Sequence, residues 1–408
     1  MSDLYDLPDG WEWRTLKEIA TIISGYAFKS KDFNKSNDLK CIKITNVGVQ
    51  SFISEDENRL SSHIVKGLSK YSVKYRDIVI ALTRPYISNG LKVTLVPNDY
   101  DGAFLNQRVA AIKSDKAILN QKFAYYYFTT PIVLSNVIEL SKTLNQPNLS
   151  IRDLSIFKLP LPSLSEQQRI VSKLDNLFEK IDKSIALHQK NMDEANVFMG
   201  SVLNDVFAEL EEKYEKIDFN SVCNKITDGS HNPPKGVENS EYLMLSSKNV
   251  FNNSINFNNP RYLKEEDFIR ENKRTDVSIG DVLLTIVGTI GRTAVVNIDE
   301  KFTLQRSVAV LKPKKELLDS YFLMYSLQKN LDILVDGAKG AAQKGIYLKS
   351  IKKLEVINIS LIHQQKIVKY LDEVSVKIEK VKLIQKEKMN NLKNLKASIL
   401  DKAFRCEL

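Results

Sequence analysis

One short sequence in this chain has the residue types needed for methyl transfer to a nucleobase. His231-Asn232-Pro233-Pro234 contains the Asn-Pro-Pro that holds the amino group of a flipped-out adenine, provided that an aromatic ring follows and stacks on the base. The next residue here is Lys235, and no glycine-rich turn of the Phe-x-Gly-x-Gly type is present for S-adenosylmethionine. Gly288-Thr289-Ile290-Gly291 has the wrong spacing for a nucleotide-binding turn. We therefore expect both segments to be structural turns or sites of close approach to a ligand.

Other catalytic templates are missing from the sequence. The three cysteines lie far apart without a CxxC pair, the four histidines are scattered, and neither an acidic cluster nor a Walker-type loop is present. The net charge of +9 indicates an anionic partner, but charge alone does not separate nucleic acid from a membrane surface. Since no apolar run approaches the ~20 residues of a bilayer span, and the first ten residues are acidic and polar, we expect a cytoplasmic protein without membrane contact.

A long internal repeat organises the chain, with the second copy starting about two hundred residues after the first. The most similar segments are Asn106-Gln107-Arg108-Val109-Ala110-Ala111-Ile112 and Leu304-Gln305-Arg306-Ser307-Val308-Ala309-Val310. Asn89-Gly90-Leu91-Lys92-Val93 likewise aligns with Ile290-Gly291-Arg292-Thr293-Ala294. In each copy, short β-branched runs alternate with Gly, Pro, Asn and Asp, which predicts a globular α/β or α+β domain rich in short strands.

Each copy ends in a segment of a different kind. From Ser163 to Met199 there is no Gly or Pro, and apolar residues recur at steps of three or four, which predicts long amphipathic helices with coiled-coil spacing. Ser165 and Gln168 fit a capping box, so the residues from Pro160 to Ser163 would form a stiff entry to the first helix. Helices of this length favour a spacer role. The predicted apolar stripes are Ile170, Leu174, Leu177, Ile181 and Ile185, and Ile367, Leu371, Val374, Ile378, Val381, Leu392, Leu395 and Ile399.

Two globular segments, each followed by such a helix, resemble the specificity subunit of type I restriction-modification systems. The resemblance rests on Leu159-Pro160-Leu161-Pro162-Ser163-Leu164-Ser165-Glu166-Gln167-Gln168-Arg169-Ile170-Val171 and on the opening Leu7-Pro8-Asp9-Gly10-Trp11-Glu12-Trp13. The second copy departs from the pattern, with Ile359, Ser360 and His363 in place of Pro162, Ser163 and Glu166. Its helix entry should therefore be less rigid.

The resemblance implies a fold and a division of labour. Two target-recognition domains, residues 1–160 and 214–358, would be related by a pseudo-two-fold repeat and joined by two long antiparallel helices in a coiled coil, residues 161–213 and 359–408. The chain would be a non-catalytic subunit that reads a bipartite double-stranded DNA target and docks two methyltransferase subunits, with restriction subunits joining that core. It would hold no cofactor itself, since S-adenosylmethionine would belong to the methyltransferase subunits, and ATP and Mg to the restriction subunits.

Two alternatives stay open at this point. One is a DNA adenine N6-methyltransferase with its own recognition domains, which the Asn-Pro-Pro sequence suggests and the absent cofactor turn opposes. The other is a coiled-coil scaffold without a DNA role. Against the scaffold stand loops rich in Arg, Asn, Gln and Lys, the side chains that read bases and bind phosphates.

The candidate DNA contacts lie where apolar strands give way to polar loops. We expect the residues that recur in both copies, Gln107-Arg108 with Gln305-Arg306 and Gln146 with Gln343, to contact phosphate or to stabilise the fold. The candidates in the first copy are Ser24, Tyr26, Lys29, Lys43, Thr45, Asn46, Arg84, Tyr86, Ser88, Asn89, Gln107, Arg108 and Gln146. Those in the second are Ser230, His231, Lys235, Ser246, Lys248, Asn249, Thr289, Arg292, Gln305, Arg306 and Gln343.

Overall fold

The computed structural model describes residues 5–88, 90–141, 146–251, 253–336, 345–405 and 407–408. The chain forms two compact units, residues 1–188 with 387–408 and residues 189–386. The division falls inside both long helices, so each unit contains one globular domain and one half of each helix. The sequence-based domain boundaries stay predictions, and the two units are described separately.

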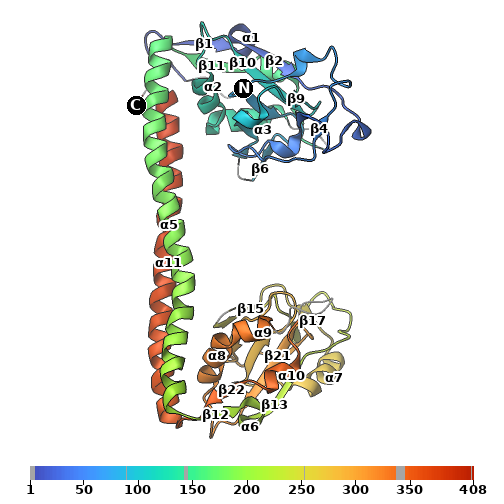
Figure 1. Cartoon of the computed structure of the whole chain (residues 1–408), viewed down its shortest axis with the longest axis vertical. Coiled ribbons are helices and arrows are strands. Elements are labelled where there is room, and N and C mark those ends of the chain that lie inside the picture. Colours follow the sequence, from blue (N-terminus) through green and yellow to red (C-terminus); the bar gives the residue numbers. More distant parts are fainter. Residues whose placement is uncertain (1–4, 89, 142–145, 252, 337–344, 406) are drawn as a thin grey trace. The chain divides into compact units, whose positions relative to one another are not determined.

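The first unit is built on an antiparallel sheet of order β2-β10-β5-β8, with a smaller sheet β4-β3-β9 beside it. Strands β2, β10, β4 and β9 of these sheets are labelled in Figure 1. Its strands are β1 (Glu12–Thr15), β2 (Ala20–Ser24), β3 (Leu39–Ile42), β4 (Arg59–Leu60), β5 (Ile78–Ala81), β6 (Tyr86–Ile87), β7 (Gly90–Leu91), β8 (Val93–Leu95), β9 (Phe104–Leu105), β10 (Val109–Ser114) and β11 (Lys158–Leu161). Its helices are α1 (Leu16–Ile19), α2 (Gln121–Phe128), α3 (Pro131–Leu140), α4 (Ile151–Ser155) and the first half of α5 (Leu164–Lys213).

The second unit repeats this plan with a sheet of order β13-β21-β18-β19 and a smaller sheet β17-β14-β20. Its strands are β12 (Lys216–Asp218), β13 (Cys223–Asp228), β14 (Leu243–Leu245), β15 (Val250–Phe251), β16 (Ser254–Ile255), β17 (Arg261–Tyr262), β18 (Val282–Thr285), β19 (Thr293–Val295), β20 (Phe302–Leu304), β21 (Val308–Pro313) and β22 (Glu355–Ile357). Its helices are α6 (Phe219–Val222), α7 (Glu265–Thr275), α8 (Ser320–Lys329), α9 (Leu331–Asp336), α10 (Leu348–Lys352) and the first half of α11 (Leu361–Phe404).

The long helices pair in opposite directions within each unit. In the first unit, Leu174 near the start of α5 shares a core with Leu400 near the end of α11, and Lys396 forms a 2.8 Å ion pair with Asp182. In the second unit, Phe207 near the end of α5 shares a core with Leu371 near the start of α11. In the part of the chain that the structure describes, none of the helices has the length and apolar character of a membrane span.

Most of the predicted stripe lies on the packed face, but two members do not. Ile170, Leu174, Ile181, Leu371 and Ile378 are buried. Val381 and Leu395 are 43% and 48% exposed, so their assignment to the pairing face is wrong. A helical period does not fix the width of the packed face, and both residues lie at its border, about 60° around the helix from Ile378 and Leu392, respectively. Leu177, Ile185, Ile367, Val374, Leu392 and Ile399 are half-buried.

The capping residue of the first long helix lies two residues before the predicted cap. Ser163 is the capping residue, because its hydroxyl accepts a hydrogen bond from the Glu166 N–H (3.4 Å) and its carbonyl from the Gln167 N–H (3.0 Å). The prediction that Ser165 caps the helix is therefore wrong. Residues 158–161 form β11, which pairs with β1, so the stiff entry belongs to a sheet rather than to a free proline segment.

A buried glutamine ties each globular domain to its long helix. Gln167 donates to the carbonyls of Ile118 (3.0 Å) and Pro162 (2.9 Å), and its amide oxygen accepts from the Asn120 N–H (2.7 Å). Gln364 makes the same three bonds in the second unit, with Leu317 (2.9 Å), Ile359 (2.9 Å) and Asp319 (2.8 Å). The two side chains are 0% and 2% exposed, so water does not compete for these bonds. We call this arrangement the glutamine clamp.

A tyrosine and an aspartate add a second tie in each unit. The hydroxyl of Tyr126 donates to Asp175 of α5, and that of Tyr325 donates to Asp372 of α11 at 2.6 Å. Burial raises the pKa of both tyrosines, and the carboxylate that each hydroxyl faces raises it further. Both phenols therefore remain protonated donors at physiological pH.

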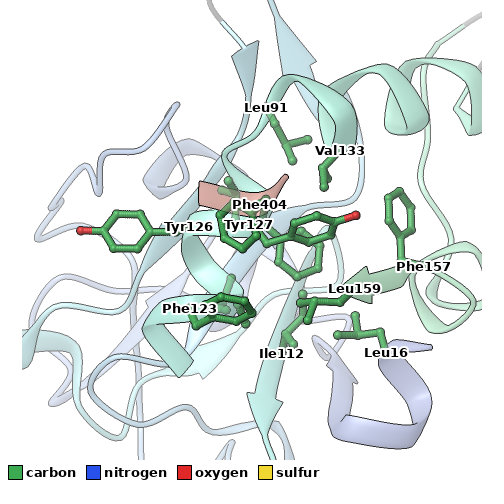
Figure 2. Close-up of a cluster of buried hydrophobic side chains, with 14 of the residues drawn as sticks. Leu16, Leu91, Ile112, Phe123, Tyr126, Tyr127, Val133, Phe157, Leu159 and Phe404 are labelled. Carbon is green, nitrogen blue, oxygen red and sulfur yellow. The ribbon is translucent and has the colours of Figure 1, made fainter. Parts of the chain in front are cut away.

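The end of α11 completes the core of the first domain (Figure 2). Phe404 is fully buried, with its ring centroid 5.0 Å from Phe123 and 5.2 Å from Tyr127. In the second domain, Phe207 of α5 takes this place, 5.5 Å from Phe322. The first domain, which leads into α5, thus takes a core aromatic residue from α11, and the second domain, which leads into α11, takes one from α5.

Replacing the clamp glutamines tests how strongly each domain is held. Gln167→Ala and Gln364→Ala should each lower the free energy of unfolding of their unit by about 2–3 kcal/mol, because three buried backbone groups lose their partner. Gln168→Ala and Gln365→Ala, at exposed neighbouring positions, should stay within about 0.5 kcal/mol of the parent. Denaturant unfolding measures both. Equal stability within each matched pair would contradict the clamp.

Candidate nucleic-acid interface

Polar loops of the first domain meet at one edge of its main sheet. Ser24 at the end of β2 pairs with Ala110, and Ala81 at the end of β5 pairs with Val109, so both strands end where β10 begins. The loop after β2 is tied to the segment before β10 by a hydrogen bond from the Gln107 N–H to the Tyr26 carbonyl (3.0 Å). The loop after β5 is tied to it by one from the Leu82 N–H to the Arg108 carbonyl (2.9 Å). We call this the loop edge. It comprises residues 24–29, 43–46, 82–92 and 106–108, of which Asn89 lies outside the described residues.

The second domain has a loop edge of the same construction. Asp228 pairs with Ala309 and Thr285 with Val308, and the Arg306 N–H donates to the Ser230 carbonyl at 2.9 Å. This edge comprises residues 228–235, 246–249, 286–292 and 305–307. Gln343 lies outside the described residues, so the predicted correspondence between Gln146 and Gln343 is not tested.

A glycine permits the close crossing of two loops at each edge. A Cβ at Gly25 would lie 2.1 Å from the carbonyl oxygen of Asn106, and one at Gly229 would lie 2.1 Å from that of Leu304. No side chain fits at such distances. These glycines therefore fix the path of the first loop across the segment before the central strand.

The strand register corrects the alignment of the two copies. The Leu82 N–H donates to the Arg108 carbonyl, and the Ile286 N–H donates to the Ser307 carbonyl, both at 2.9 Å. Arg108 is thus equivalent to Ser307, not to Arg306, and Gln107 is equivalent to Arg306. The expectation that Gln107-Arg108 and Gln305-Arg306 occupy shared positions is therefore wrong. The two sequences look most alike when one copy is shifted by one residue along the other, and the hydrogen bonds exclude that shift.

The same register shows that the alignment of Lys92 with Thr293 is also wrong by one residue, and it reveals a shared basic position. The Ala81 N–H donates to the Lys92 carbonyl (3.1 Å), and the Thr285 N–H donates to the Arg292 carbonyl (2.9 Å). Burial, and then the charge of Arg84, lower the pKa of Lys92. The Arg292 guanidinium lies 4.7 Å from the ring centroid of Phe251. Both domains therefore place one cation beside the start of the edge strand.

Asn46 and Asn249 are structural, so their assignment as DNA contacts is wrong. Asn46 is fully buried, accepts from the Lys43 N–H (2.7 Å) and donates to the Ile53 carbonyl (2.8 Å). Asn249, which is 4% exposed, accepts from the Ser246 N–H (3.0 Å) and donates to two carbonyls of the following loop. Both amides close their own turns and have no free face for a base.

The remaining candidates differ in how far they reach solvent. Ser230 is buried, which contradicts its assignment as a contact, and Tyr86 is half-buried against the core. Ser24, Lys43, Gln146, Ser246, Arg292 and Gln305 are half-buried. The exposed candidates are Tyr26, Lys29, Thr45, Arg84, Ser88, Gln107, Arg108, His231, Lys235, Lys248, Thr289 and Arg306.

In the second copy, a charged cluster orients His231. Its Nε2 lies 2.8 Å from the Asp228 carboxylate, which also accepts from Arg274 of α7. The Asp228 carboxylate is buried, whereas the imidazole is 55% exposed. Sequence reasoning found His231 but missed Asp228 and Arg274, since Arg274 is 46 residues away and no spacing pattern links it to the loop.

Comparison with known proteins decides the family. A model of the type I restriction modification DNA specificity domain matches residues 8–191 and 211–388. The chain belongs to this family. Its two recognition domains, its repeat and its predicted α/β (α+β) fold class are thereby confirmed, and it is a type I specificity subunit.

Relatives and solved structures agree over nearly the whole length. The Escherichia coli EcoBI specificity subunit is 26% identical, with 100% of this chain and 88% of the relative covered. The EcoKI specificity subunit of Escherichia coli strain K12 is 24% identical, with 98% and 90% covered. A chain from a structure described as the basis of complex assembly and conformational transition of the type I R-M system has a TM-score of 0.76 at 24% identity, with 99% and 100% covered. The HsdS subunit from Thermoanaerobacter tengcongensis has a TM-score of 0.55 at 23% identity, with 99% of both chains covered.

Proposed function

We propose that each loop edge of this specificity subunit reads one half of a bipartite double-stranded DNA target. The observation that carries the proposal is one edge built twice, with different side chains at equivalent positions. Gln107 in the first domain stands where Arg306 stands in the second, and Arg108 stands where Ser307 stands. A common frame with different polar side chains suits the reading of two different base sequences.

We infer that the chain itself transfers no methyl group. The carbonyl of Pro234 accepts a 2.7 Å hydrogen bond from Arg261, which ties the Asn-Pro-Pro loop to the smaller sheet. Lys235 follows where base stacking requires an aromatic ring. S-adenosylmethionine would then be held by methyltransferase subunits, and ATP and Mg by restriction subunits, with no cofactor on this chain. The methyltransferase alternative is accordingly the weaker one.

We propose the partners that membership of this family implies, and the repeated helices support them. Two methyltransferase subunits would dock on the two helix pairs, with restriction subunits joining them, in the cytoplasm where the DNA lies. Several large apolar side chains of the helices are exposed, including Val197 (72%), Val376 (68%) and Leu187 (61%), which supports protein docking there. The 50 residues of α5 extend about 75 Å at 1.5 Å per residue, which supports a spacer role as well. The alternative function, a coiled-coil scaffold without a DNA role, does not explain why both domains have a polar loop edge.

Exchange of one domain tests the proposal. Residues 12–161 begin and end in the paired strands β1 and β11, so this segment is a natural unit for replacement by that of a relative. The donor should keep aromatic residues at Phe123 and Tyr127, because both rings contact Phe404. The exchange should change one half of the methylated motif and leave the other intact, as read by methylation sequencing of DNA from cells that also make the methyltransferase subunits.

Two controls make this result decisive. The parent chain without methyltransferase subunits should leave the DNA unmethylated, and methylation in that arm would refute the non-catalytic role. Exchange of residues 216–357, bounded by the paired strands β12 and β22, should change the other half of the motif. A change of both halves in either exchange would refute independent reading.

The shared cations should act on the DNA backbone. Lys92→Gln and Arg292→Gln should weaken binding to a similar extent for all DNA sequences, and each should reduce the slope of log affinity against log salt by about one. Titration of the assembled complex with specific and nonspecific duplexes at several salt concentrations measures both. Lys116→Gln, at an exposed position beyond the other end of β10, is the control and should change neither. Loss confined to the specific duplex would assign these residues to bases instead.

A further inference from the structure

Two arginines of the first domain have a left-handed backbone. Arg76 has φ of +69° and Arg84 has φ of +48°, and they lie beyond opposite ends of strand β5. A residue with a Cβ adopts this conformation only at a cost, which glycine avoids. The second domain avoids it at both equivalent positions, Gly280 and Gly288, with φ of +94° and +84°.

Hydrogen bonds establish these equivalences. The Arg76 N–H donates to the Val96 carbonyl (2.9 Å), as the Gly280 N–H donates to that of Val296 (2.8 Å). At the other end of the strand, Thr83 forms a bridge with Asn148, and Val287 forms one with Gly345. Arg84 and Gly288 are the next residues of the two copies. The fold thus accepts glycine at the Arg84 position, so the arginine there is not needed for the turn.

The surroundings of Arg84 set it apart from Arg76. Its N–H donates to the Pro147 carbonyl (2.8 Å), and the Gln146 amide oxygen, in the orientation that satisfies its hydrogen bonds, accepts from both Nε and Nη2 of its guanidinium, the latter at 2.8 Å. One segment thus holds both the backbone and the side chain. Arg76 lies at the far end of β5 from the loop edge, and its guanidinium is stacked 5.1 Å from the ring centroid of Tyr75.

The contact with Gln146 does not use the end of the Arg84 guanidinium that can hydrogen-bond a base. Gln146 engages the side that carries Nε, whereas the end of the fork that carries the remaining N–H groups of Nη1 and Nη2 is not used by this contact. Two parallel donors at that end match the O6 and N7 acceptors of guanine in the major groove. Arg84 is also exposed at the loop edge, beside Lys92, the cation we assign to the DNA backbone.

We propose that Arg84, held by Gln146, is a specificity-determining residue that hydrogen-bonds a guanine in the half-site read by the first domain. The proposal rests on the proposed function, since it requires the loop edge to face DNA. The second domain, with Gly288 at this position, reads its half-site without an equivalent contact.

The test compares the same substitution at two matched sites. Arg84→Gly and Arg76→Gly each copy the residue of the second domain, so both variants should unfold close to the parent temperature. With the methyltransferase subunits present, Arg84→Gly should reduce discrimination at one base pair of the first half-site on the order of 10- to 100-fold and leave the second half-site unchanged. Arg76→Gly should retain the parental motif. Methylation rates on a set of single-base variants of the target provide the measurement.

Arg84→Lys separates geometry from charge. Lysine keeps the charge but lacks the planar fork, so discrimination at the same base pair should fall while general DNA affinity stays near that of the parent. Full discrimination by Arg84→Lys or Arg84→Gly would overturn the proposal, as would an equal loss on every DNA sequence, which would assign Arg84 to phosphate. A parent complex without any sequence-specific methylation would instead refute the proposed function itself.

Discussion

The buried glutamine of the glutamine clamp is the interaction on which the rest of each unit depends. Gln167 and Gln364 join a loop before a domain helix, the end of the closing strand and the first turn of the long helix in a single set of three hydrogen bonds. A loop edge can select a base only if its frame does not rotate on the helix. Since the glutamine side chain is shielded from water, any rotation would leave buried donors and acceptors without partners.

On this fixed frame, sheet register decides which side chains are comparable between the domains. The glycines at positions 25 and 229 and the asparagines at positions 46 and 249 have the same structural task in both copies. Lys92 and Arg292 share a charge as well as a position. Where the frame no longer constrains the side chain, the copies diverge, as with Arg84 and Gly288. The division between shared structure and divergent contact follows from the fold itself.

Much of the architecture is predictable from the sequence, because it depends on periodicity. The duplication and the two long helices follow from repeated segments and from steps of three and four residues without Gly or Pro. The sequence does not settle which serine caps the first long helix, because Ser163 and Ser165 are each followed three residues later by a side chain that fits a capping box. Only the observed hydrogen bonds select Ser163. The prediction that Val381 and Leu395 lie on the packed face is wrong because a helical period does not fix the width of that face.

The site was predictable at the level of loops but not of side chains. Polar residues after strands indicate the loop edge. Asn46, however, is of a residue type that often contacts bases, and yet it is fully buried. The pairing of copies slipped by one residue because Gln-Arg occurs in both, and strand register is set by hydrogen bonds that composition does not report. Arg274 and the link between Arg84 and Gln146 depend on contacts between residues 46 and 62 positions apart, respectively, which no local pattern encodes.

The most direct test of the account is photo-cross-linking from the loop edges in the assembled complex on its target duplex. A photoreactive residue at position 107 should cross-link to one half-site, and one at position 289 should cross-link to the other, because both positions are exposed on loop edges. The same probe at Lys116 or Lys315, both exposed and beyond the opposite ends of the central strands, should give no cross-link. Cross-links from Lys116 and Lys315, with none from positions 107 and 289, would contradict the claim that the loop edges read DNA.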